Sequence, residues 1–527
     1  MNAAAVVNRL WHLASLPAAR RFARALDDPG RWQRQRLARL LRANADTAFG
    51  RAHGFAAIRD PDHYRRAVPL RTYAGFAPWI ERIRAGETTV LTRAAVTRLV
   101  PTGGSAGGSK LIPWTAGLAA EFTASIGAWI VDLQRRCPSL RDGPAYWSIS
   151  PQGPQASGGA VPIGFEDDTA YLGRALAPVM ASVLAAPSCL RGIDDLAAFR
   201  HATLRCLLAQ RELRLISVWN PSFLTLLLDH AQSGRERLIA DIRRGGATGL
   251  PAHLMRSARP WLGADPERAK ELERADWSSP TALWPRLAMI SCWADAAAGL
   301  PARALARRLG GVAIQAKGLL ATEAAVTIPW RGRCVAAVTG PVLEFLSADG
   351  SPRWIDELTA GSVYEVVLTT AGGLARYRLG DLVRVEGFVG RTPCLRFLGR
   401  SGATCDLVGE KLDEAFVAAC LDRVVPAAGF AMLAPNPSGD GYTLFSDRAV
   451  DAATLARLDG ELAANPQYAL ARRLAQLAPL RAFQVAGTGA AVALAHRAVG
   501  RVLGAVKPLA LDRDRGWDQR LPGAYLA

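Results

Sequence analysis

Apolar residues recur every three or four positions through much of residues 1–50. This spacing is typical of amphipathic helices, in which such positions share one face. The repeat comprises Val6, Leu10, Leu13, Leu37, Leu40 and Leu41. Pro17 interrupts the repeat, and the run Asp27-Asp-Pro-Gly30 favours a turn, because proline lacks the N–H that a helix interior needs. We therefore predict a helical lead-in over residues 1–50 with a break at Pro17.

Residues 115–300 alternate between helical repeats and short apolar runs. We predict a helix from Gly117 to Leu133 and strands at residues 145–149 and 213–219. Such alternation predicts α/β layers. The following part is richer in short apolar runs and predicts a mixed or antiparallel sheet. Those runs are residues 311–315, 334–338, 342–346, 363–368 and 381–385.

The pattern changes again after Arg400, to a shorter succession of strand, helix, strand and helix. We therefore place a domain boundary near residues 400–402. The predicted fold class is α/β, with a large N-terminal domain over residues 1–400 and a small C-terminal domain over residues 401–527. A chain of 527 residues, half of them apolar, can bury a core in each part.

Composition adds a net charge of +18, carried almost entirely by arginine. The arginines are spread along the chain without a nucleic-acid module or a dense basic tail, so we expect no nucleic-acid partner. No window of about 20 apolar residues occurs, so we expect neither a membrane span nor a membrane partner. The eight cysteines lack the spacing of zinc ligands. We expect a cytoplasmic protein that is a monomer or a weak dimer.

A glycine-rich run, Thr102-Gly-Gly-Ser-Ala-Gly-Gly-Ser-Lys110, is the first motif that indicates chemistry. An apolar run at residues 96–100 precedes it and a predicted helix follows it. Strand, glycine loop and helix together present backbone N–H groups to an anion. The spacing is not that of a Walker loop. Its hydroxyls and amides suit a triphosphate, and a purely structural turn is the alternative.

Further motifs carry charged side chains. Glu323 follows an apolar strand, where a carboxylate can hold magnesium beside phosphates; a surface ion pair is the alternative. Asp381, in Tyr377-Arg-Leu-Gly-Asp381, can accept hydrogen bonds from ribose hydroxyls or belong to an ordinary Gly-Asp turn. Arg400 lies at the predicted boundary. Lys507 is the last of only five lysines in the chain, and a solvated surface lysine is its alternative.

The order of these motifs resembles that of adenylate-forming enzymes. The chain most resembles the auxin-responsive Gretchen Hagen family of acyl acid amido synthetases, as a member of bacterial type, and the likeness runs nearly from end to end. It is carried by residues 101–113, 290–293, 314–323, 377–388, 410–414, 465–468 and 506–508.

This resemblance implies a two-domain adenylate-forming enzyme fold, with a large N-terminal domain of layered β-sheets and helices and a small, mobile C-terminal α/β domain. It implies that ATP and a small carboxylic acid give an acyl adenylate and pyrophosphate. An amine or amino acid would then attack the adenylate to give an amide and AMP. ATP and Mg²⁺ are the implied cofactors.

The resemblance also assigns residues by position. The implied nucleotide-binding residues are Thr102, Gly103, Ser105, Gly107, Lys317, Gly318, Thr322, Tyr377 and Asp381. Catalytic roles fall to Glu323, which would bind Mg²⁺, to Arg400 at the hinge, and to Lys507, which would stabilise charge on the transferring phosphoryl group. The candidate acid pocket, placed by analogy, comprises Phe122, Trp129, Trp219 and Phe223.

Two other functions fit parts of the same pattern. One is a ligase of the same superfamily that passes the acyl group to coenzyme A or to a carrier-protein thiol. The other is a nucleotide-binding protein without catalytic activity. The presence of Glu323, Asp381 and Lys507 favours an active enzyme, while the identities of the acid and the amine cannot be read from these residues.

Overall fold

The computed structural model describes residues 3–102, 110–148, 159–164, 182–401, 404–487 and 509–526. The chain forms two compact units, and each is assembled from separated stretches of sequence. The first unit comprises residues 1–143, 154–184 and 317–397, and the second comprises residues 144–153, 185–316 and 398–527. A division into domains at residue 400 stays a prediction.

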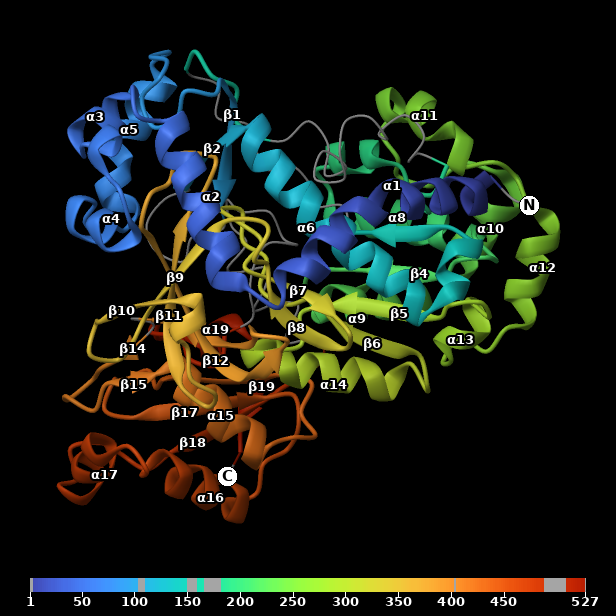
Figure 1. The fold of residues 1–527 in the computed structure, drawn as a ribbon. Helices are drawn as coiled ribbons and strands as arrows, with labels where there is room; N and C mark the ends of the chain where they lie inside the picture. The colour runs from blue at the N-terminus through green and yellow to red at the C-terminus, as the bar shows by residue number, and fades with distance from the viewer. Residues whose placement is uncertain are drawn as a thin grey trace. The chain divides into compact units, whose positions relative to one another are not determined.

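The first unit begins with the predicted helical lead-in (Figure 1). Its helices are α1 (Ala3–Ala25), α2 (Pro29–Ala43), α3 (Ala48–Ala52), α4 (Pro61–Ala67) and α5 (Tyr73–Arg84). The predicted turn before α2 is confirmed, since the Asp28 carboxylate caps this helix by accepting from the Arg31 N–H at 3.1 Å. The predicted break at Pro17 is wrong, because α1 continues through it. Pro17 lies on the exposed side of α1, whereas tertiary packing holds the opposite side.

A β-hairpin follows, formed by β1 (Val96–Thr102) and β2 (Lys110–Thr115). It corrects the prediction that the glycine loop leads directly into a helix, because a second strand intervenes and Thr102 pairs with Lys110 across the ends of the loop. Pro113 within β2 favours the extended backbone. Helix α6 (Ala116–Arg136) starts only after Thr115, its N-cap, whose side chain accepts from the Leu118 N–H at 3.1 Å.

Helix α6 packs against α1 and β7 inside the first unit. Its length and apolar composition would allow it to cross a membrane, yet 67% of its apolar window is buried within the protein. Its limits agree closely with the helix predicted for residues 117–133. The side chain of Asp132 accepts from the backbone N–H of Arg331 at 3.0 Å, which fixes α6 to the turn after β7.

A seven-stranded sheet completes the first unit, although residues 398–400 at the C-terminal end of β13 are assigned to the second unit. Its spatial order is β10-β9-β11-β12-β13-β8-β7, and the paired strands whose register is described are antiparallel. This confirms the sheet type predicted from the apolar runs at residues 334–385, whereas the run at residues 311–315 instead joins the parallel sheet of the second unit. The strands are β7 (Thr327–Trp330), β8 (Arg333–Ala336), β9 (Val342–Leu346), β10 (Pro352–Trp354), β11 (Val363–Thr369), β12 (Tyr377–Val389) and β13 (Thr392–Arg400).

The second unit contains the predicted α/β layers. Its parallel sheet has the order β3 (Ala145–Trp147), β4 (Leu215–Ser217), β5 (Met289–Cys292) and β6 (Ala313–Ala316). The surrounding helices are α8 (Leu196–Ala209), α9 (Pro221–Ser233), α10 (Arg235–Arg244), α11 (Ala252–Ala258), α12 (Pro266–Arg274), α13 (Pro280–Leu283) and α14 (Gly299–Arg308). Their buried apolar side chains form one core with the strands, as expected for parallel strands covered by helices.

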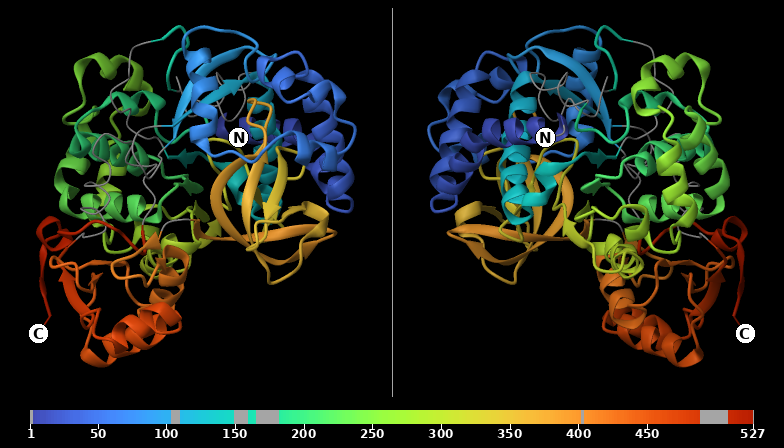
Figure 2. Two further views of the ribbon diagram at one scale, coloured as in Figure 1. Left: turned by 90° about the vertical axis from the view of Figure 1, so that its left-hand side faces the viewer. Right: turned by 90° about the vertical axis from the view of Figure 1, so that its right-hand side faces the viewer.

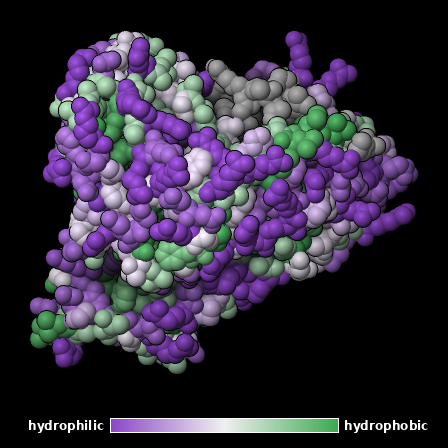
Figure 3. All heavy atoms as spheres, in the orientation of Figure 1, coloured by the Kyte–Doolittle hydropathy of each residue, from purple (hydrophilic) through white to green (hydrophobic). Residues whose placement is uncertain are grey.

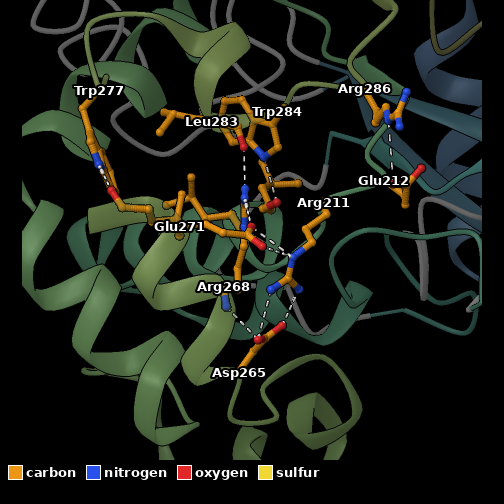
Figure 4. Close-up of polar contacts among 12 residues, drawn as sticks. Arg211, Glu212, Asp265, Arg268, Glu271, Trp277, Leu283, Trp284 and Arg286 are labelled. Carbon is orange, nitrogen blue, oxygen red and sulfur yellow. Dashed lines mark hydrogen bonds and ion pairs between the residues drawn. The ribbon is translucent and has the colours of Figure 1, made fainter. Parts of the chain in front are cut away.

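An arginine network ties these helices together (Figure 4). Arg268 on α12 is 3% exposed and donates to the carbonyl of Leu208 at 2.8 Å and to Glu271 at 2.9 Å. Arg211, just after α8, donates to Asp265 at 2.6 Å and to Glu271 at 3.0 Å. The buried guanidinium therefore has partners for its charge, which a buried cation requires.

The C-terminal part of the second unit has its own sheet, in the order β16-β17-β18-β19, and Figure 2 shows its helices beside it. The β17–β18 pair is parallel and its neighbours are antiparallel, as expected for a small α/β layer. The elements are β14 (Thr404–Cys405), β15 (Leu412–Asp413), α15 (Glu414–Val424), β16 (Ala431–Pro435), β17 (Tyr442–Ser446), α16 (Ala452–Leu462), α17 (Pro466–Arg473), β18 (Arg481–Val485), α19 (Trp517–Arg520) and β19 (Gly523–Tyr525).

Candidate active site

Thr322 and Glu323 form the tip of a tight hairpin between β6 and β7. The backbone N–H of Ala321 donates to the carbonyl of Ala324 at 3.0 Å, which closes a four-residue turn around the pair. Glu323 is only 4% exposed, whereas Thr322 is partly exposed. The carboxylate is thus held at a fixed place by the backbone, and a surface ion pair does not describe its environment.

Gly318 makes this hairpin possible. Its φ is +77°, and a Cβ there would lie 2.5 Å from the Thr327 hydroxyl oxygen. That oxygen accepts from the Leu319 N–H at 2.7 Å, so the close approach cannot be relaxed without breaking a hydrogen bond. The resemblance gives Gly318 a nucleotide-binding role, which stays a prediction; its structural role is to let the chain turn back toward β7.

Tyr377 joins two motifs that are far apart in the sequence. Its hydroxyl donates to Glu323 Oε1 at 3.3 Å, and its ring is 1% exposed. The ring of Phe76 packs edge-on against it at 5.9 Å between centroids. The fold therefore brings the Thr-Glu motif and the Tyr-x-x-Gly-Asp motif together, which their common assignment to one site requires.

Asp381 lies on the same strand, within a β-bulge. The pairing of β12 with β11 shifts register opposite residues 365–367, where Gly380 adopts a φ of +78°. A bulge turns a side chain away from the ordinary alternation of the strand. Asp381 is completely buried, so the carboxylate is fixed in the interior of the first unit instead of facing solvent in a simple turn.

Arg376, which is not among the predicted site residues, anchors the start of β12. Its guanidinium contacts Glu344 at 3.0 Å and donates to the carbonyls of Arg65 and Val68, both at 2.8 Å. Its φ of +51° is unusual for a residue other than glycine. Arg376 thus positions the residue next to it, Tyr377. Its position directly before a motif was the signal that could have revealed it.

Trp129 of α6 lies near Lys317, at the start of the Thr-Glu hairpin. The Lys317 ammonium lies 6.0 Å from the centroid of the Trp129 ring, and both side chains are 2% exposed. Phe122 stacks on Trp114 at 5.4 Å between centroids. The structure therefore places Trp129 beside a predicted nucleotide-binding residue, within reach of a cation–π contact.

The two remaining acid-pocket candidates belong to the second unit. Trp219 follows β4 and packs at 5.8 Å from Trp293, a residue in one of the resemblance motifs that had no assigned role. Phe223 is 4% exposed and belongs to the hydrophobic core, with its ring 6.4 Å from that of Phe199. Their part in a pocket stays a prediction.

The ends of the glycine loop are fixed by β1 and β2. Thr102 is partly exposed at the end of β1. The Tyr73 hydroxyl accepts from the Leu111 N–H at 2.8 Å, and burial raises the pKa of Tyr73. Arg400 is the last residue of β13 and is partly exposed. The other predicted residues, Gly103, Ser105, Gly107 and Lys507, lie outside the described residues.

Sequence comparison decides the family. The GH3 family N-terminal domain matches residues 18–312, and the GH3 family central domain matches residues 342–400. The chain belongs to the GH3 family. The second match spans β12 with Tyr377 and Asp381, and the first spans the hairpin that carries the glycine loop. The glycine loop and the Tyr-x-x-Gly-Asp motif therefore lie in recognised GH3 segments.

Individual relatives agree with this family. The GH3 chain is 26% identical over 427 residues to the indole-3-acetic acid-amido synthetase GH3.8 of Oryza sativa subsp. indica, covering 74% of this chain and 69% of the relative. Its fold matches the solved AtGH3.15 acyl acid amido synthetase in complex with 2,4-DB, with a TM-score of 0.84 at 18% identity, covering 97% and 95% of the two chains. A 2-hydroxyisobutyryl-CoA ligase matches with a TM-score of 0.51 at 11% identity, covering 91% and 88%.

These findings confirm the predicted family and the adenylate-forming fold. This GH3 chain is an acyl acid amido synthetase, a ligase that forms an amide bond. The contact between Tyr377 and Glu323 is the feature of the described residues that ties the sequence motifs to one site.

Proposed function

We propose that this GH3 chain uses MgATP to convert an apolar carboxylic acid into its acyl adenylate, and then transfers the acyl group to an amino acid or another amine. The observation that supports the proposal most is the buried Glu323 carboxylate, held by the hydroxyl of Tyr377 at 3.3 Å. A buried carboxylate is costly to keep charged, and binding a metal ion beside ATP would be a chemical reason to keep one there.

Activation is needed because a carboxylate has no good leaving group. One oxygen of the acid attacks the α-phosphorus of ATP, the bond to the bridging oxygen breaks, and pyrophosphate leaves. The amine nitrogen then attacks the acyl carbon, loses a proton and expels AMP, a stable phosphate monoester. No oxidant or reductant is required, and each half-reaction is balanced by the substrates alone.

Glu323 is the residue proposed to hold Mg²⁺. Its hard carboxylate oxygens suit this ion, which usually takes one or two protein carboxylates together with substrate phosphates. The described residues contain no cluster of three or more His, Cys, Asp or Glu side chains that could hold a metal, and such binding does not need one. Bound magnesium would neutralise phosphate charge during adenylation.

Asp381 is proposed to accept hydrogen bonds from the ribose hydroxyls, and Lys317 and Thr322 to contact the nucleotide. For the acid, Trp129 and Phe122 favour an aromatic or long aliphatic body, because both side chains are buried among apolar neighbours of α6. The name of the rice relative, an indole-3-acetic acid-amido synthetase, supports an aryl acid.

A pyrophosphate-exchange screen tests the proposal. We expect acid-dependent incorporation of labelled pyrophosphate into ATP with aryl, indolyl or fatty acids, and little with short polar acids. The active acid is then incubated with ATP and either amino acids or coenzyme A. Amide formation without a thiol supports the assignment, whereas exchange with polar acids alone contradicts the proposed acid class, and a thioester as sole product contradicts the proposed acceptor.

A further inference from the structure

Helix α1 displays a row of aliphatic side chains to solvent. Val6 is 41% exposed, Leu10 54% and Leu13 59%. Because they are spaced four and three positions apart, they lie along one face of the helix and form a ridge. We call these three residues the α1 ridge. Figure 3 shows a hydrophobic patch on the part of the surface that α1 occupies in Figure 1.

The ridge cannot be buried by rotation of the helix. On the opposite face, Trp11 is 5% exposed and Phe22 is fully buried. The side chain of Asn8 also donates to the carbonyl of Gly143 at 2.9 Å. The fold therefore holds α1 in one orientation, with the ridge on its solvent side. A row of three such side chains differs from the isolated exposed aliphatic residues that are ordinary on protein surfaces.

Positive charge continues the same face toward the C-terminal end of α1. Arg20, Arg21 and Arg24 are exposed. At about 3.6 residues per turn they lie on the same face of α1 as the ridge, toward its C-terminal end. The Arg21 guanidinium lies 5.3 Å from the Trp32 ring centroid, which holds it near this surface. The first 26 residues contain four arginines and no acidic residue. The fourth, Arg9, lies 3.8 Å from Asp142.

We propose that α1 docks this GH3 chain onto an anionic lipid surface, with the α1 ridge entering the interfacial layer and Arg20, Arg21 and Arg24 meeting lipid phosphates. Aliphatic side chains beside cations are the combination that binds such surfaces. Charge favours lipid over a second copy of the chain, because each copy carries a net charge of +18 and would bring the same cationic face to the contact.

This proposal departs from the expectation of no membrane partner, which rested on the absence of a spanning segment. Docking needs no such segment, since the helix lies on the surface with its inner face kept in the protein. The proposal is independent of the acid and the amine that the enzyme uses. It concerns only the outer surface of the first unit.

Co-sedimentation of the full chain with vesicles tests it. We expect binding to vesicles of phosphatidylcholine mixed with phosphatidylglycerol, little binding to phosphatidylcholine alone, and release at high salt. The double variant L10S/L13S should lower the vesicle-bound to free ratio about tenfold or more, because two aliphatic side chains no longer leave water. The triple variant R20Q/R21Q/R24Q should lower it to a similar extent.

The matched control is L470S/L474S, which removes two exposed leucines, 47% and 58% exposed, from the end of α17. This control should bind vesicles as the unaltered chain does. All variants should keep the melting temperature and the pyrophosphate-exchange rate of the unaltered chain. Equal binding to both lipid compositions, or undiminished binding by L10S/L13S, overturns the proposal. So does a dimer in sedimentation velocity that L10S/L13S converts to monomer, because the ridge would then be a self-interface.

Discussion

At the scale of single residues, the site depends on the orientation of one buried carboxylate, that of Glu323. Glu323 is buried, and the Tyr377 hydroxyl reaches its Oε1 at 3.3 Å. A long hydrogen bond of this kind contributes modestly to energy but fixes the direction in which the carboxylate points. Glu323 and Tyr377 could each be selected from the sequence by their motifs, whereas the contact between them could not.

Replacing Tyr377 with phenylalanine should therefore lower adenylation without unfolding the protein. We expect the pyrophosphate-exchange rate to fall roughly five- to tenfold, consistent with about 1 kcal/mol for the lost hydrogen bond to a charged group. The concentration of magnesium required for half-maximal exchange should rise, because the carboxylate loses its orientation. Exchange rates measured over a magnesium titration give both values.

The control for this variant is Tyr364→Phe, which removes another sheet hydroxyl, one that accepts from the Thr359 N–H at 3.2 Å. It should leave the magnesium dependence unchanged. A Tyr377→Phe protein with unaltered exchange at every magnesium concentration would show that Glu323 does not need this hydroxyl.

At the scale of elements, the β12 bulge decides where Asp381 lies. Sequence alone places Gly380 and Asp381 in a turn-like pair, but the register shift against β11 makes them part of a long strand. The left-handed φ of +78° at Gly380 is the local cause of the bulge, because residues with a side chain avoid that region.

Gly380→Ala should consequently cost about 1–2 kcal/mol of folding free energy and raise the KM for ATP severalfold by displacing Asp381. Gly350→Ala is the matched control, since Gly350 has a φ of +79° in a turn with open space around it. Both variants should shift the urea midpoint similarly, and only Gly380→Ala should change KM. An equal effect of both on KM would contradict the role of the bulge.

The network between α8 and α12 predicts a dependence of stability on pH. Hydrogen bonds from Arg211 hold the pKa of Asp265 below its ordinary value of 3.8. Because the folded-state pKa is lowered, this stabilisation is fully present above about pH 4 and is lost as the pH falls through the folded pKa. Both side chains are about one-third exposed, so the contribution stays under about 1 kcal/mol.

Arg211→Gln should therefore lower the urea midpoint at pH 7, and the difference from the unaltered chain should shrink as the pH falls below 3.8. Urea unfolding at a series of pH values measures this. A difference that stays constant into acid would mean that Arg211 stabilises the helices only by packing.

The elements also show where local patterns are sufficient. The period of α6 and the apolar run of β9 each predicted an element with nearly its observed limits. The prediction at Pro17 was wrong because packing of the inner face of α1 outweighs the loss of one helical hydrogen bond. The glycine loop leads into β2 and not directly into the expected helix. The strand forms because it pairs with β1, and local periodicity does not predict such pairing.

At the scale of the whole molecule, two half-reactions must share one protein. The resemblance assigns Lys507 to the first, in which charge builds on the transferring phosphoryl group. We expect Lys507→Ala to reduce adenylation about a hundredfold or more while amide formation from supplied acyl adenylate changes much less. Single-turnover measurements of each half-reaction test this, and an equal loss in both would contradict the assignment.

The sequence by itself determined the family, the order of the motifs and several individual helices and strands, because these depend on local periodicity and on residue identity. Only the tertiary structure decided that Tyr377 reaches Glu323, that a bulge buries Asp381, and that Arg376 anchors the start of β12. It also decided that the α1 ridge stays exposed while the opposite face of α1 is locked in the core. Each of these depends on contacts between segments distant in the chain, whose free energies no local pattern records.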